Sequence, residues 1–365
     1  MSGFGVFARP GEEARVGWRA DDGVLDLSPL GDVFSRPSLN ALMAQGRGAW
    51  EDAVGRAQEL DPETAVPLDD VQLRLPFEVA DYVDFYSSLE HATNLGRLFR
   101  PDSEPLLPNW RWLPVGYHGR AGTIVVSGTD IVRPSGQSWA AGSEAPGFGP
   151  SRRLDVELEL GFVVGVPSRL GEPVPPDAFA DHVFGVVLVN DWSARDLQAW
   201  EYQPLGPFLG KSFATSISAW VTPLRLLEEA RVAAPPQEPP ALPQLAGGRD
   251  WALDVALQLE LNGEVVSRGT AAGLYWTMPQ QLAHATSNGA SVRTGDLMAS
   301  GTISGSERGS EGSLIELTRN GAEPLRLADG SERAFLEDGD EAVLHGRAAN
   351  GVELGEVRGR VRAAR

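Results

Sequence analysis

Short apolar segments, interrupted at brief intervals by glycine or proline, set the strongest limit on how this chain folds. The 365 residues include 42 glycines and 27 prolines, and both residue types weaken the interior of a helix. The apolar runs that remain have the length and the alternation of β-strands. They lie at residues 123–128, 155–166, 182–192, 251–266, 296–305, 313–321 and 340–348. The sequence therefore predicts a mostly β, α+β fold with few helices.

The first part of the chain has a different pattern from the rest. Residues 4–28 contain short alternating strands with turns, and residues 38–60 repeat apolar positions as an amphipathic helix does. A strand-rich region follows, with a proline-rich connection at residues 233–248. We therefore expect two domains, residues 1–78 and residues 79–365, which also fits the chain length.

Composition excludes several classes of function. The chain has no cysteine, which rules out thiolate nucleophiles, zinc–thiolate sites and iron–sulfur clusters. Its formal net charge of −19 opposes binding to nucleic acid or to an anionic membrane. No segment has the length of a membrane span, and the first residues lack a secretory signal pattern. We expect a cytoplasmic protein, in which a few arginines can still hold an anionic small molecule.

Lys211 is the only lysine among the 31 basic residues, and it lies in the segment PLGPFLGKSFATS, residues 204–216. This segment is similar to a phosphate-binding loop, but such a loop needs four residues between its two glycines. Here Gly206 and Gly210 enclose three residues, one of which is Pro207 and lacks an amide N–H. The nucleotide-binding interpretation is therefore rejected. Lys211 is either functional or an accident of composition at an exposed position.

Four acidic residues form a candidate metal site. In LDVELEL, residues 154–160, the period of two places Glu157 and Glu159 on one face of a strand. Asp191 follows an apolar run, where an unpaired acid is costly, and Asp84 lies among aromatic residues. Two acidic residues on one face of a strand are more often exposed to solvent than bound to a metal ion. Four carboxylates without a thiolate nevertheless favour a hard divalent cation, Mg²⁺ or Ca²⁺.

A second group of polar residues lies in FYSSLEHATNLGRLFR, residues 85–100. It contains Tyr86, His91 and Arg100. A single histidine is usually structural, but here the imidazole comes with a phenol and with a guanidinium that can bind a carboxylate. Tyr117 and Tyr202 lie near glycines that permit close approach of the backbone, although each alone is more typical of core packing.

Several segments together resemble the fumarylacetoacetate hydrolase family. They are DYVDFYSSLEHATNLGRLFR, LPVGYHGRAGTIVVSG, LDVELEL, NDWSARDLQAWEYQPLGPFLGKSFATS, YWTMPQQLAH and GDLMASGTISG. The resemblance implies a small N-terminal SH3-like barrel over residues 1–78. It further implies a larger mixed β-roll catalytic domain over residues 79–365 and a homodimer.

The resemblance also implies a role for individual residues. His91 is the expected general base, and Glu316 is the carboxylate expected to orient it. The groups expected around an oxyanion are Arg195, Gln198 and Lys211. The expected substrate contacts are Tyr86, Arg100, Tyr117, Gln198, Tyr202 and Thr302. The expected ligands of Mg²⁺ or Ca²⁺ are Asp84, Glu157, Glu159 and Asp191, with a second cation near Asp191, Lys211 and Thr215.

Two of these expectations carry a physical condition. The ammonium of Lys211 has no lone pair, so only its backbone carbonyl can bind a cation. Family members often have Gly-Thr-Thr where this chain has Ala214, Thr215 and Ser216, which leaves the backbone at the second cation open. Without the resemblance, Glu316 would be interpreted as a charge on the surface of a strand.

The implied reaction is hydrolysis of a carbon–carbon bond in 4-fumarylacetoacetate, a β-diketone carboxylate, to fumarate and acetoacetate. This is the last step of tyrosine and phenylalanine catabolism through homogentisate. His91 would activate the attacking water, with a metal ion on the diketone. The alternatives are an acylpyruvate hydrolase or decarboxylase on the same fold, and a non-catalytic metal-dependent binding protein. The FYSSLEHATN segment favours the diketone hydrolase.

Overall fold

One large mixed sheet dominates the computed structural model, which describes residues 3–140 and 142–365. Its 13 strands within these ranges are β1 (Phe4–Ala8), β2 (Arg15–Ala20), β3 (Gly23–Asp26), β4 (Val66–Pro67), β5 (Gln72–Arg74), β6 (Tyr82–Phe85), β7 (Gly116–His118), β8 (Ile124–Val126), β13 (Leu158–Val164), β14 (Val183–Asn190), β16 (Thr215–Ile217), β17 (Trp220–Pro223) and β22 (Leu297–Ala299). They pair in the order β4-β3-β2-β1-β17-β14-β13-β22-β6-β7, with β5 beside β1 and with β16 beside β14 and β8.

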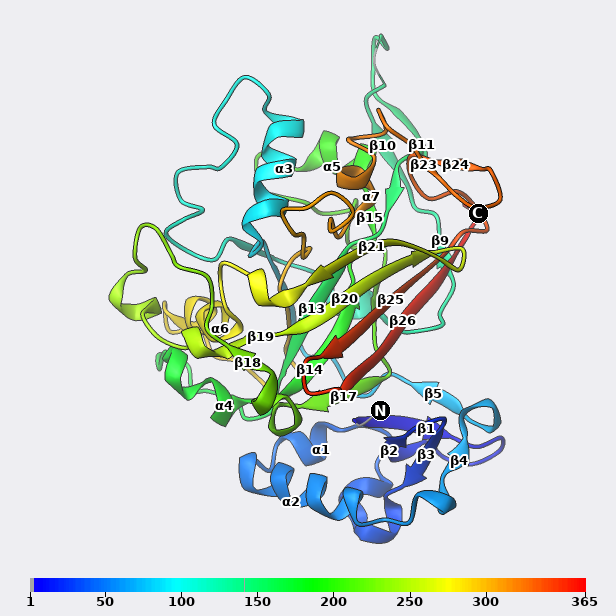
Figure 1. Cartoon of the computed structure of the whole chain (residues 1–365), viewed down its shortest axis with the longest axis vertical. Coiled ribbons are helices and arrows are strands. Elements are labelled where there is room, and N and C mark those ends of the chain that lie inside the picture. Colours follow the sequence, from blue (N-terminus) through cyan, green and yellow to red (C-terminus); the bar gives the residue numbers. More distant parts are fainter. Residues whose placement is uncertain (1–2, 141) are drawn as a thin grey trace.

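A second sheet lies across the first, as Figure 1 shows for its long strands. It consists of β9 (Ile131–Val132), β20 (Val255–Leu261), β21 (Glu264–Thr270), β25 (Glu341–Ala348) and β26 (Glu353–Arg362), in the order β21-β20-β25-β26-β9. Short pairs complete the strands: β10 (Ser135–Ser138) with β11 (Gly147–Pro150), β12 (Leu154–Asp155) with β15 (Ser193–Ala194), β18 (Arg231–Val232) with β19 (Ala252–Leu253), and β23 (Leu325–Arg326) with β24 (Glu332–Arg333). The predicted mostly β fold with mixed sheets is confirmed.

The helices are short and lie mainly at the ends of strands. They are α1 (Asn40–Met43), α2 (Arg47–Gln58), α3 (Leu89–Phe99), α4 (Phe179–His182), α5 (Arg195–Glu201), α6 (Met278–Thr286) and α7 (Leu314–Leu317). The single helix predicted over residues 38–60 is two helices, because Gly46 between them adopts a φ of 87° that ends a helix. The strand predicted over residues 313–321 is wrong, since this segment begins with α7.

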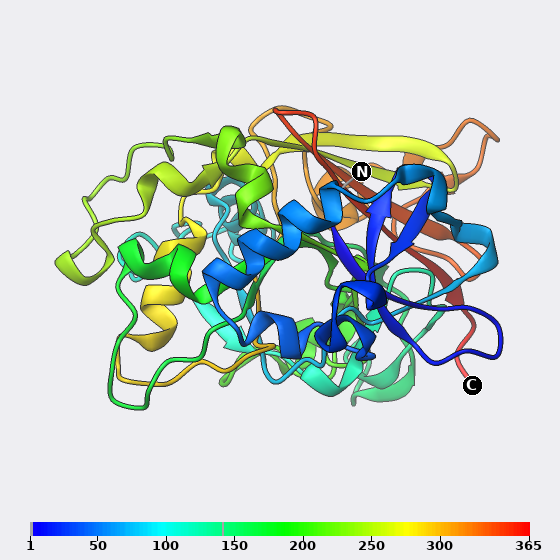
Figure 2. The ribbon, with the colours of Figure 1, turned by 90° about the horizontal axis from the view of Figure 1, so that it is seen from below.

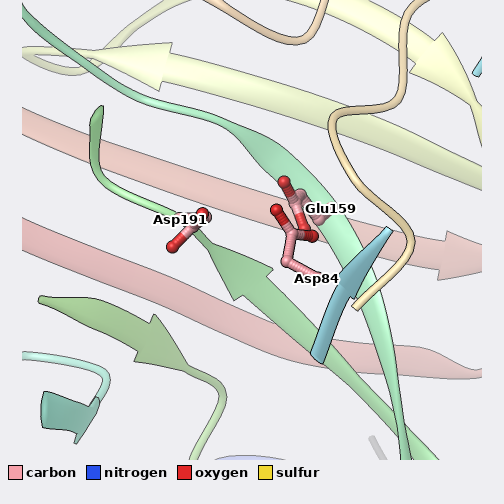
Figure 3. Close-up of side chains that lie close together, drawn as sticks. All are labelled: Asp84, Glu159 and Asp191. Carbon is pink, nitrogen blue, oxygen red and sulfur yellow. The ribbon is translucent and has the colours of Figure 1, made fainter. Parts of the chain in front are cut away.

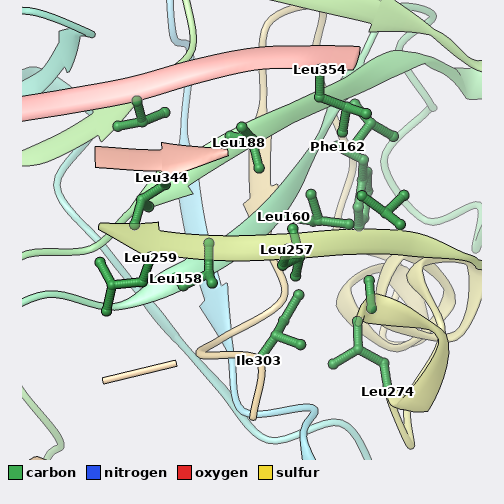
Figure 4. Close-up of a cluster of buried hydrophobic side chains, with 14 of the residues drawn as sticks. Leu158, Leu160, Phe162, Leu188, Leu257, Leu259, Leu274, Ile303, Leu344 and Leu354 are labelled. Carbon is green, nitrogen blue, oxygen red and sulfur yellow. The ribbon is translucent and has the colours of Figure 1, made fainter. Parts of the chain in front are cut away.

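The core lies on both faces of β13 and β14, whose residues are all buried. Along β13, Leu158, Leu160 and Phe162 alternate toward the second sheet and pack with Leu257 and Leu344 (Figure 4). The opposite face packs with a separate cluster that includes residues of α2. Replacing one of these leucines with alanine is expected to cost about 2–5 kcal/mol. A carboxylate on such a strand is therefore held in a rigid, dry environment.

The N-terminal residues cover one end of the molecule (Figure 2). Strand β1 pairs with β17 through Phe4 and Val221, so the N-terminal strands continue the large sheet. The strand pairs of the described residues close no barrel, and the SH3-like barrel is not confirmed. The predicted division at residues 78 and 79 stays a prediction. Among the helices of the described residues, none has the length and apolar character required to span a membrane.

Candidate active site

Three carboxylates meet where neighbouring strands of the large sheet end. Asp84 lies on β6, Glu159 on β13 and Asp191 directly after β14. The strand register brings them together, because β14 pairs with β13 and because β22 lies between β13 and β6. One oxygen from each carboxylate lies within 4.8 Å of the other two, and all three side chains are buried. Figure 3 shows this acid cluster, which is predicted here as metal ligands.

Two members of the acid cluster, Asp84 and Glu159, have oxygens that receive no hydrogen bond from the described residues. Among the described residues, neither oxygen of Glu159 receives a hydrogen bond, and nor does Asp84 Oδ1. Burial, followed by the charges of the neighbouring carboxylates, raises the pKa of Asp84 and the pKa of Glu159 well above their ordinary values. Unpaired carboxylate oxygens in a buried site are suitable ligands for a hard divalent cation. The donor set therefore fits a cation between Asp84, Glu159 and Asp191.

Asp191 is the member of the cluster that the protein itself supplies with donors. Its Oδ1 accepts a hydrogen bond from Thr215 Oγ1 at 2.7 Å. Its Oδ2 accepts from Lys211 Nζ and from Tyr117 Oη, both at 2.9 Å. The structure thus brings the predicted residues Lys211, Thr215 and Tyr117 together around one carboxylate.

Lys211 is a buried cation inside the site and not an exposed residue. Its side chain is 6% exposed, and Nζ donates to Glu157 Oε2 as well as to Asp191. Burial opposes its charge, but Asp191 and Glu157 raise the pKa of Lys211 above its ordinary value, so it remains an ammonium. The interpretation of the single lysine as an exposed accident of composition is therefore wrong.

Arg195 lies at the start of α5 and is fixed by three side chains. Its Nε donates to Asp155 Oδ2 at 2.8 Å, its Nη2 to Glu157 Oε1 at 2.7 Å and its Nη1 to Gln198 Oε1 at 3.2 Å. Although burial raises it, the charges of Arg195 and Lys211 hold the pKa of Glu157 below its ordinary value. Glu157 thus differs from Glu159, since Glu157 is ionised and paired, while the oxygens of Glu159 have no hydrogen-bond partner in the part of the chain that the structure describes.

His91 and Glu316 form a buried pair on the other side of Glu157. The hydroxyl of Ser88 caps α3 by accepting from the His91 N–H at 3.2 Å, which places His91 in the first helical turn. His91 Nδ1 donates to Glu316 Oε2 at 2.6 Å, because a carboxylate only accepts. His91 Nε2, 3.9 Å from Glu157 Oε1, is therefore the nitrogen with a free lone pair. This is the arrangement of an oriented general base.

Glu316 is itself held by three further donors that the sequence did not single out. Its Oε1 accepts from Asn94 Nδ2 at 2.9 Å, and its Oε2 accepts from Ser304 Oγ at 3.0 Å and Ser313 Oγ at 2.6 Å. Burial raises the pKa of Glu316, but the interaction with His91 and these donors bring it below its ordinary value. Asn94 and Ser304 come from other segments of the chain, so no local pattern links them to Glu316. Ser313 is in the same segment, and its Ser-x-x-Glu spacing with Glu316 is a local signal for the start of a helix.

The remaining predicted residues have contacts of different kinds. The ring of Tyr86 meets the ring of His91 edge to face at 5.3 Å, and Thr302 is buried. Arg100 Nη2 donates to the carbonyl of Pro105 at 2.7 Å, and Tyr202 accepts from Gln203 Nε2 at 2.9 Å. No hydrogen bond within the described ranges joins Arg100 or Tyr202 to the acid cluster.

Asp155 is a further residue that the sequence prediction did not assign, although a signal was present. It has the same parity as Glu157 and Glu159 in LDVELEL. Its carboxylate is fully buried and binds Arg195. The alternation that predicted Glu157 and Glu159 thus also includes Asp155.

A cavity of about 340 Å³ opens onto Asp191 and Lys211. Its lining also includes Tyr117, Arg120 and Thr215. A small molecule in this cavity would meet Lys211 and, of the acid cluster, Asp191.

Comparison with known proteins gives one consistent family. The sequence profile described as "Fumarylacetoacetate (FAA) hydrolase C-terminal" matches residues 81–362. The chain is 46% identical to the fumarylacetoacetase of Caenorhabditis elegans, over 98% of this chain and 94% of that protein. It is 45% identical to the fumarylacetoacetase of Homo sapiens, over 94% of this chain and 90% of that protein.

Solved structures share the fold at lower identity. The fumarylacetoacetate hydrolase from Exiguobacterium antarcticum aligns over all of both chains with a TM-score of 0.61 and 20% identity. The maleylpyruvate hydrolase from Sphingobium sp. SYK-6, in complex with manganese(II) ion and pyruvate, aligns over all of both chains with a TM-score of 0.58 and 16% identity.

Proposed function

The chain belongs to the fumarylacetoacetate hydrolase family, and from that premise we propose how its site carries out the reaction. It is a hydrolase of carbon–carbon bonds that converts fumarylacetoacetate into fumarate and acetoacetate, as its fumarylacetoacetase relatives indicate, and it serves tyrosine catabolism. The observation that carries the mechanism is the buried pair of His91 and Glu316 beside the acid cluster. A protein that only binds a metal ion needs no oriented base.

His91 acts as the general base. Glu316 fixes the Nδ1–H tautomer, so Nε2 accepts a proton from the water that attacks the substrate carbonyl. The ionised Glu316 also stabilises the imidazolium that forms, since its carboxylate lies 2.6 Å from Nδ1. His91 is then able to return the proton to the departing carbon fragment.

Lys211, Arg195 and Gln198 stabilise the oxyanion of the tetrahedral intermediate. Lys211 uses two N–H groups on Asp191 and Glu157, which leaves one donor. Arg195 uses three of its five N–H groups on side chains of the site. Gln198 accepts from Arg195 through Oε1, which keeps its amide group as a donor. Each residue therefore has a donor left for substrate after its protein contacts.

The acid cluster of Asp84, Glu159 and Asp191 would hold a divalent cation, Mg²⁺ or Ca²⁺, with Glu157 beside it as a fourth ligand. This is supported by the unpaired oxygens of Asp84 and Glu159 and by the manganese(II) ion named for the maleylpyruvate hydrolase structure. Bound there, the cation would supply a Lewis acid that stabilises the negative charge on the carbon fragment that leaves as acetoacetate. A second cation near Asp191, the Lys211 backbone carbonyl and Thr215 is part of the same proposal.

The substrate carboxylates are proposed to meet polar groups around this centre. Arg100 supplies a guanidinium, and Tyr86, Tyr117, Tyr202 and Thr302 supply hydroxyl groups. Two observations support this. The hydroxyl of Thr302 is buried without a partner among the described residues, and Tyr117 lines the cavity.

A homodimer, a cytoplasmic location and an SH3-like arrangement of residues 1–78 are further parts of the proposal. The dimer is supported by large apolar side chains that remain exposed around α5, since patches of this kind mark contact surfaces. They are Trp139, Phe148, Trp200, Leu205, Phe208 and Leu209. Sedimentation of the purified protein tests the dimer, and a single species of 39.1 kDa would contradict it.

The function is tested by following the loss of fumarylacetoacetate absorbance with purified protein and by identifying the products. Fumarate and acetoacetate in equal amounts are expected. Acylpyruvate substrates are assayed in parallel, and a higher kcat/KM for one of them would favour the alternative hydrolase. Absence of turnover with every substrate, with metal still bound, would favour the binding protein.

A further inference from the structure

Asp155 gathers donors from three separate parts of the site. Its side chain is fully buried. Its Oδ1 accepts from the backbone N–H groups of Val156 at 2.9 Å and Leu314 at 2.8 Å. Its Oδ2 accepts from the N–H of Ile315 at 3.1 Å and from Arg195 Nε at 2.8 Å. The four acceptor positions of a carboxylate are therefore all in use.

One side of Asp155 holds the start of α7. A helix of four residues is not stable alone, because its first turn costs more entropy than its few hydrogen bonds return. Its N-cap residue, Ser313, makes no side-chain capping bond, because its hydroxyl donates to Glu316 instead. Asp155 binds the N–H groups that this cap leaves open. Glu316 is the next residue of the helix.

The other side of Asp155 holds Arg195. Asp155 fixes the guanidinium at Nε. The segment just before Asp155 also holds the Arg195 backbone, since the Arg195 N–H donates to the Arg153 carbonyl at 2.9 Å. Because the guanidinium is planar, the contact at Nε also fixes the directions in which Nη1 and Nη2 donate.

We propose that Asp155 is a positioning residue that fixes Arg195, on the oxyanion side, relative to Glu316, on the base side. The proposal rests on the function given above, in which Arg195 meets the oxyanion and Glu316 orients His91. Asp155 is not one of the three carboxylates of the acid cluster, and its acceptor positions are used by protein donors. It sets the distance between two groups that must act on the same carbonyl at once.

The test is the isosteric Asp155→Asn variant, assayed on fumarylacetoacetate. An amide nitrogen accepts no hydrogen bond, so the donors at the oxygen that it replaces lose their acceptor. These are Arg195 and Ile315 at Oδ2, or Val156 and Leu314 at Oδ1, and the start of α7 shifts in either case. Misplacement of about 1 Å can cost on the order of 10²-fold in rate. We expect kcat to fall by about that factor, while KM changes far less. A low-field proton resonance of His91 Nδ1–H, bonded to Glu316, should also shift or broaden.

Asp340→Asn is the matched control. Asp340 is 3% exposed and binds Arg333 and the Glu337 N–H, but it lies outside the site. Both variants are expected to lower the melting temperature, and only Asp155→Asn is expected to lower kcat. Equal kcat values for the two variants at a temperature where both are folded would overturn the proposal.

Combined variants show whether Asp155 acts through its two partners. Added to Glu316→Gln or to Arg195→Gln, Asp155→Asn should reduce kcat by a smaller factor than it does in the unmodified protein, because part of its effect is already lost. Fully multiplicative losses would overturn the proposal. If Asp155→Asn alone does not fold, its combination with Arg195→Gln removes the buried charges as a pair. The double variant should then remain less active than Arg195→Gln, and equal activity would overturn the proposal.

The proposed function fails separately. An unmodified protein that does not hydrolyse fumarylacetoacetate, or a His91→Ala variant with full activity, would refute the mechanism before Asp155 is considered. With both of those results as expected, the outcome for Asp155 depends only on the positioning role.

Discussion

The two halves of the site differ in how completely the protein satisfies them. On the base side, Glu316 accepts hydrogen bonds from His91, Asn94, Ser304 and Ser313. On the acid side, both oxygens of Glu159 lack a partner among the described residues, although the side chain is fully buried. The carboxylate of the base side thus has its hydrogen bonds when the chain folds, while the acid side keeps carboxylate oxygens without hydrogen-bond donors among the described residues.

This difference assigns different roles to the two halves. A saturated carboxylate is rigid and fixes one tautomer of its histidine, which suits a base that must work in one geometry. Buried acids without donors are unfavourable unless a proton or a cation neutralises them. The base side is therefore expected to respond to mutation and the acid side to metal supply. Lys211 links the two halves. It binds Asp191 of the acid cluster and also Glu157, whose Oε1 lies 3.9 Å from His91 Nε2.

The largest expected effect is on the acid side. Chelation should abolish turnover, and Mg²⁺ or Ca²⁺ should restore it, because the cluster offers only oxygen ligands. Metal should also raise the melting temperature in a concentration-dependent manner. Assays with and without chelator, together with elemental analysis, check both effects. Full activity in excess chelator, with no metal detected, would contradict the comparison.

Glu159→Gln makes this prediction sharper. The change replaces a buried carboxyl group whose oxygens have no hydrogen-bond partner among the described residues, so the metal-free variant should be at least as stable as the metal-free unmodified protein. Metal should stabilise the variant less. Asp340→Asn again serves as the control, since its destabilisation should be the same with and without metal.

The second largest effect is on the base side. His91→Ala should lower kcat by roughly 10²–10⁴, the usual contribution of a general base. Within the described ranges His91 is the only imidazole bonded to Glu316, so no other oriented base can replace it. Metal binding should be unchanged. Glu316→Gln should lower kcat less, since an amide oxygen still accepts from Nδ1–H. Steady-state kinetics and metal titration test this, and an active His91→Ala variant would remove the proposed mechanism.

The comparison also shows how much of the site the sequence alone provides. Glu157 and Glu159 were predicted together from period-two alternation, and Asp191 from its place after an apolar strand. These are local patterns. The pairing of His91 with Glu316, which are 225 positions apart, was available only through the family resemblance. The donors from Ser304, Ser313 and Asn94 were not predicted at all.

The fold shows the same limit. Strands β13 and β14 were predicted because short apolar segments between glycines and prolines have the length and alternation of β-strands. Helix α7 was mistaken for a strand, because its first turn depends on Asp155, a residue 159 positions away from Leu314. Local propensity cannot contain a contact of that range. The break between α1 and α2 was locally encoded at Gly46, and it was overlooked.

Lys211→Arg is expected to have a smaller effect than loss of the base, with kcat reduced at least tenfold. If the position required only positive charge, arginine would suffice, as it does at every other basic position of the chain. The ammonium, however, is 6% exposed between two carboxylates. A broad, planar guanidinium should displace Gln198 or the diketone oxygen, and a shift of about 1 Å can cost on the order of 10²-fold. Near-normal kcat and kcat/KM for the folded, metal-binding variant would show that the oxyanion role is wrong.

The smallest expected effect is a pH dependence of stability in the metal-free protein. Burial and neighbouring acids raise the pKa of Asp84 and of Glu159 well above their values in the unfolded chain. Their contribution to stability is therefore fully present below about pH 4, where the unfolded chain protonates them, and it is lost as pH rises through the folded-state values. The metal-free protein should have a melting temperature lower at pH 8 than at pH 6 by about 2 °C or more.

Saturating metal should remove this trend, because a bound cation replaces the proton. The Glu159→Gln variant should show a weaker dependence in chelator. Thermal unfolding at both pH values checks this, and a metal-free Glu159→Gln variant with the same slope as the unmodified protein would show that unmet charge on the acid side does not control its stability.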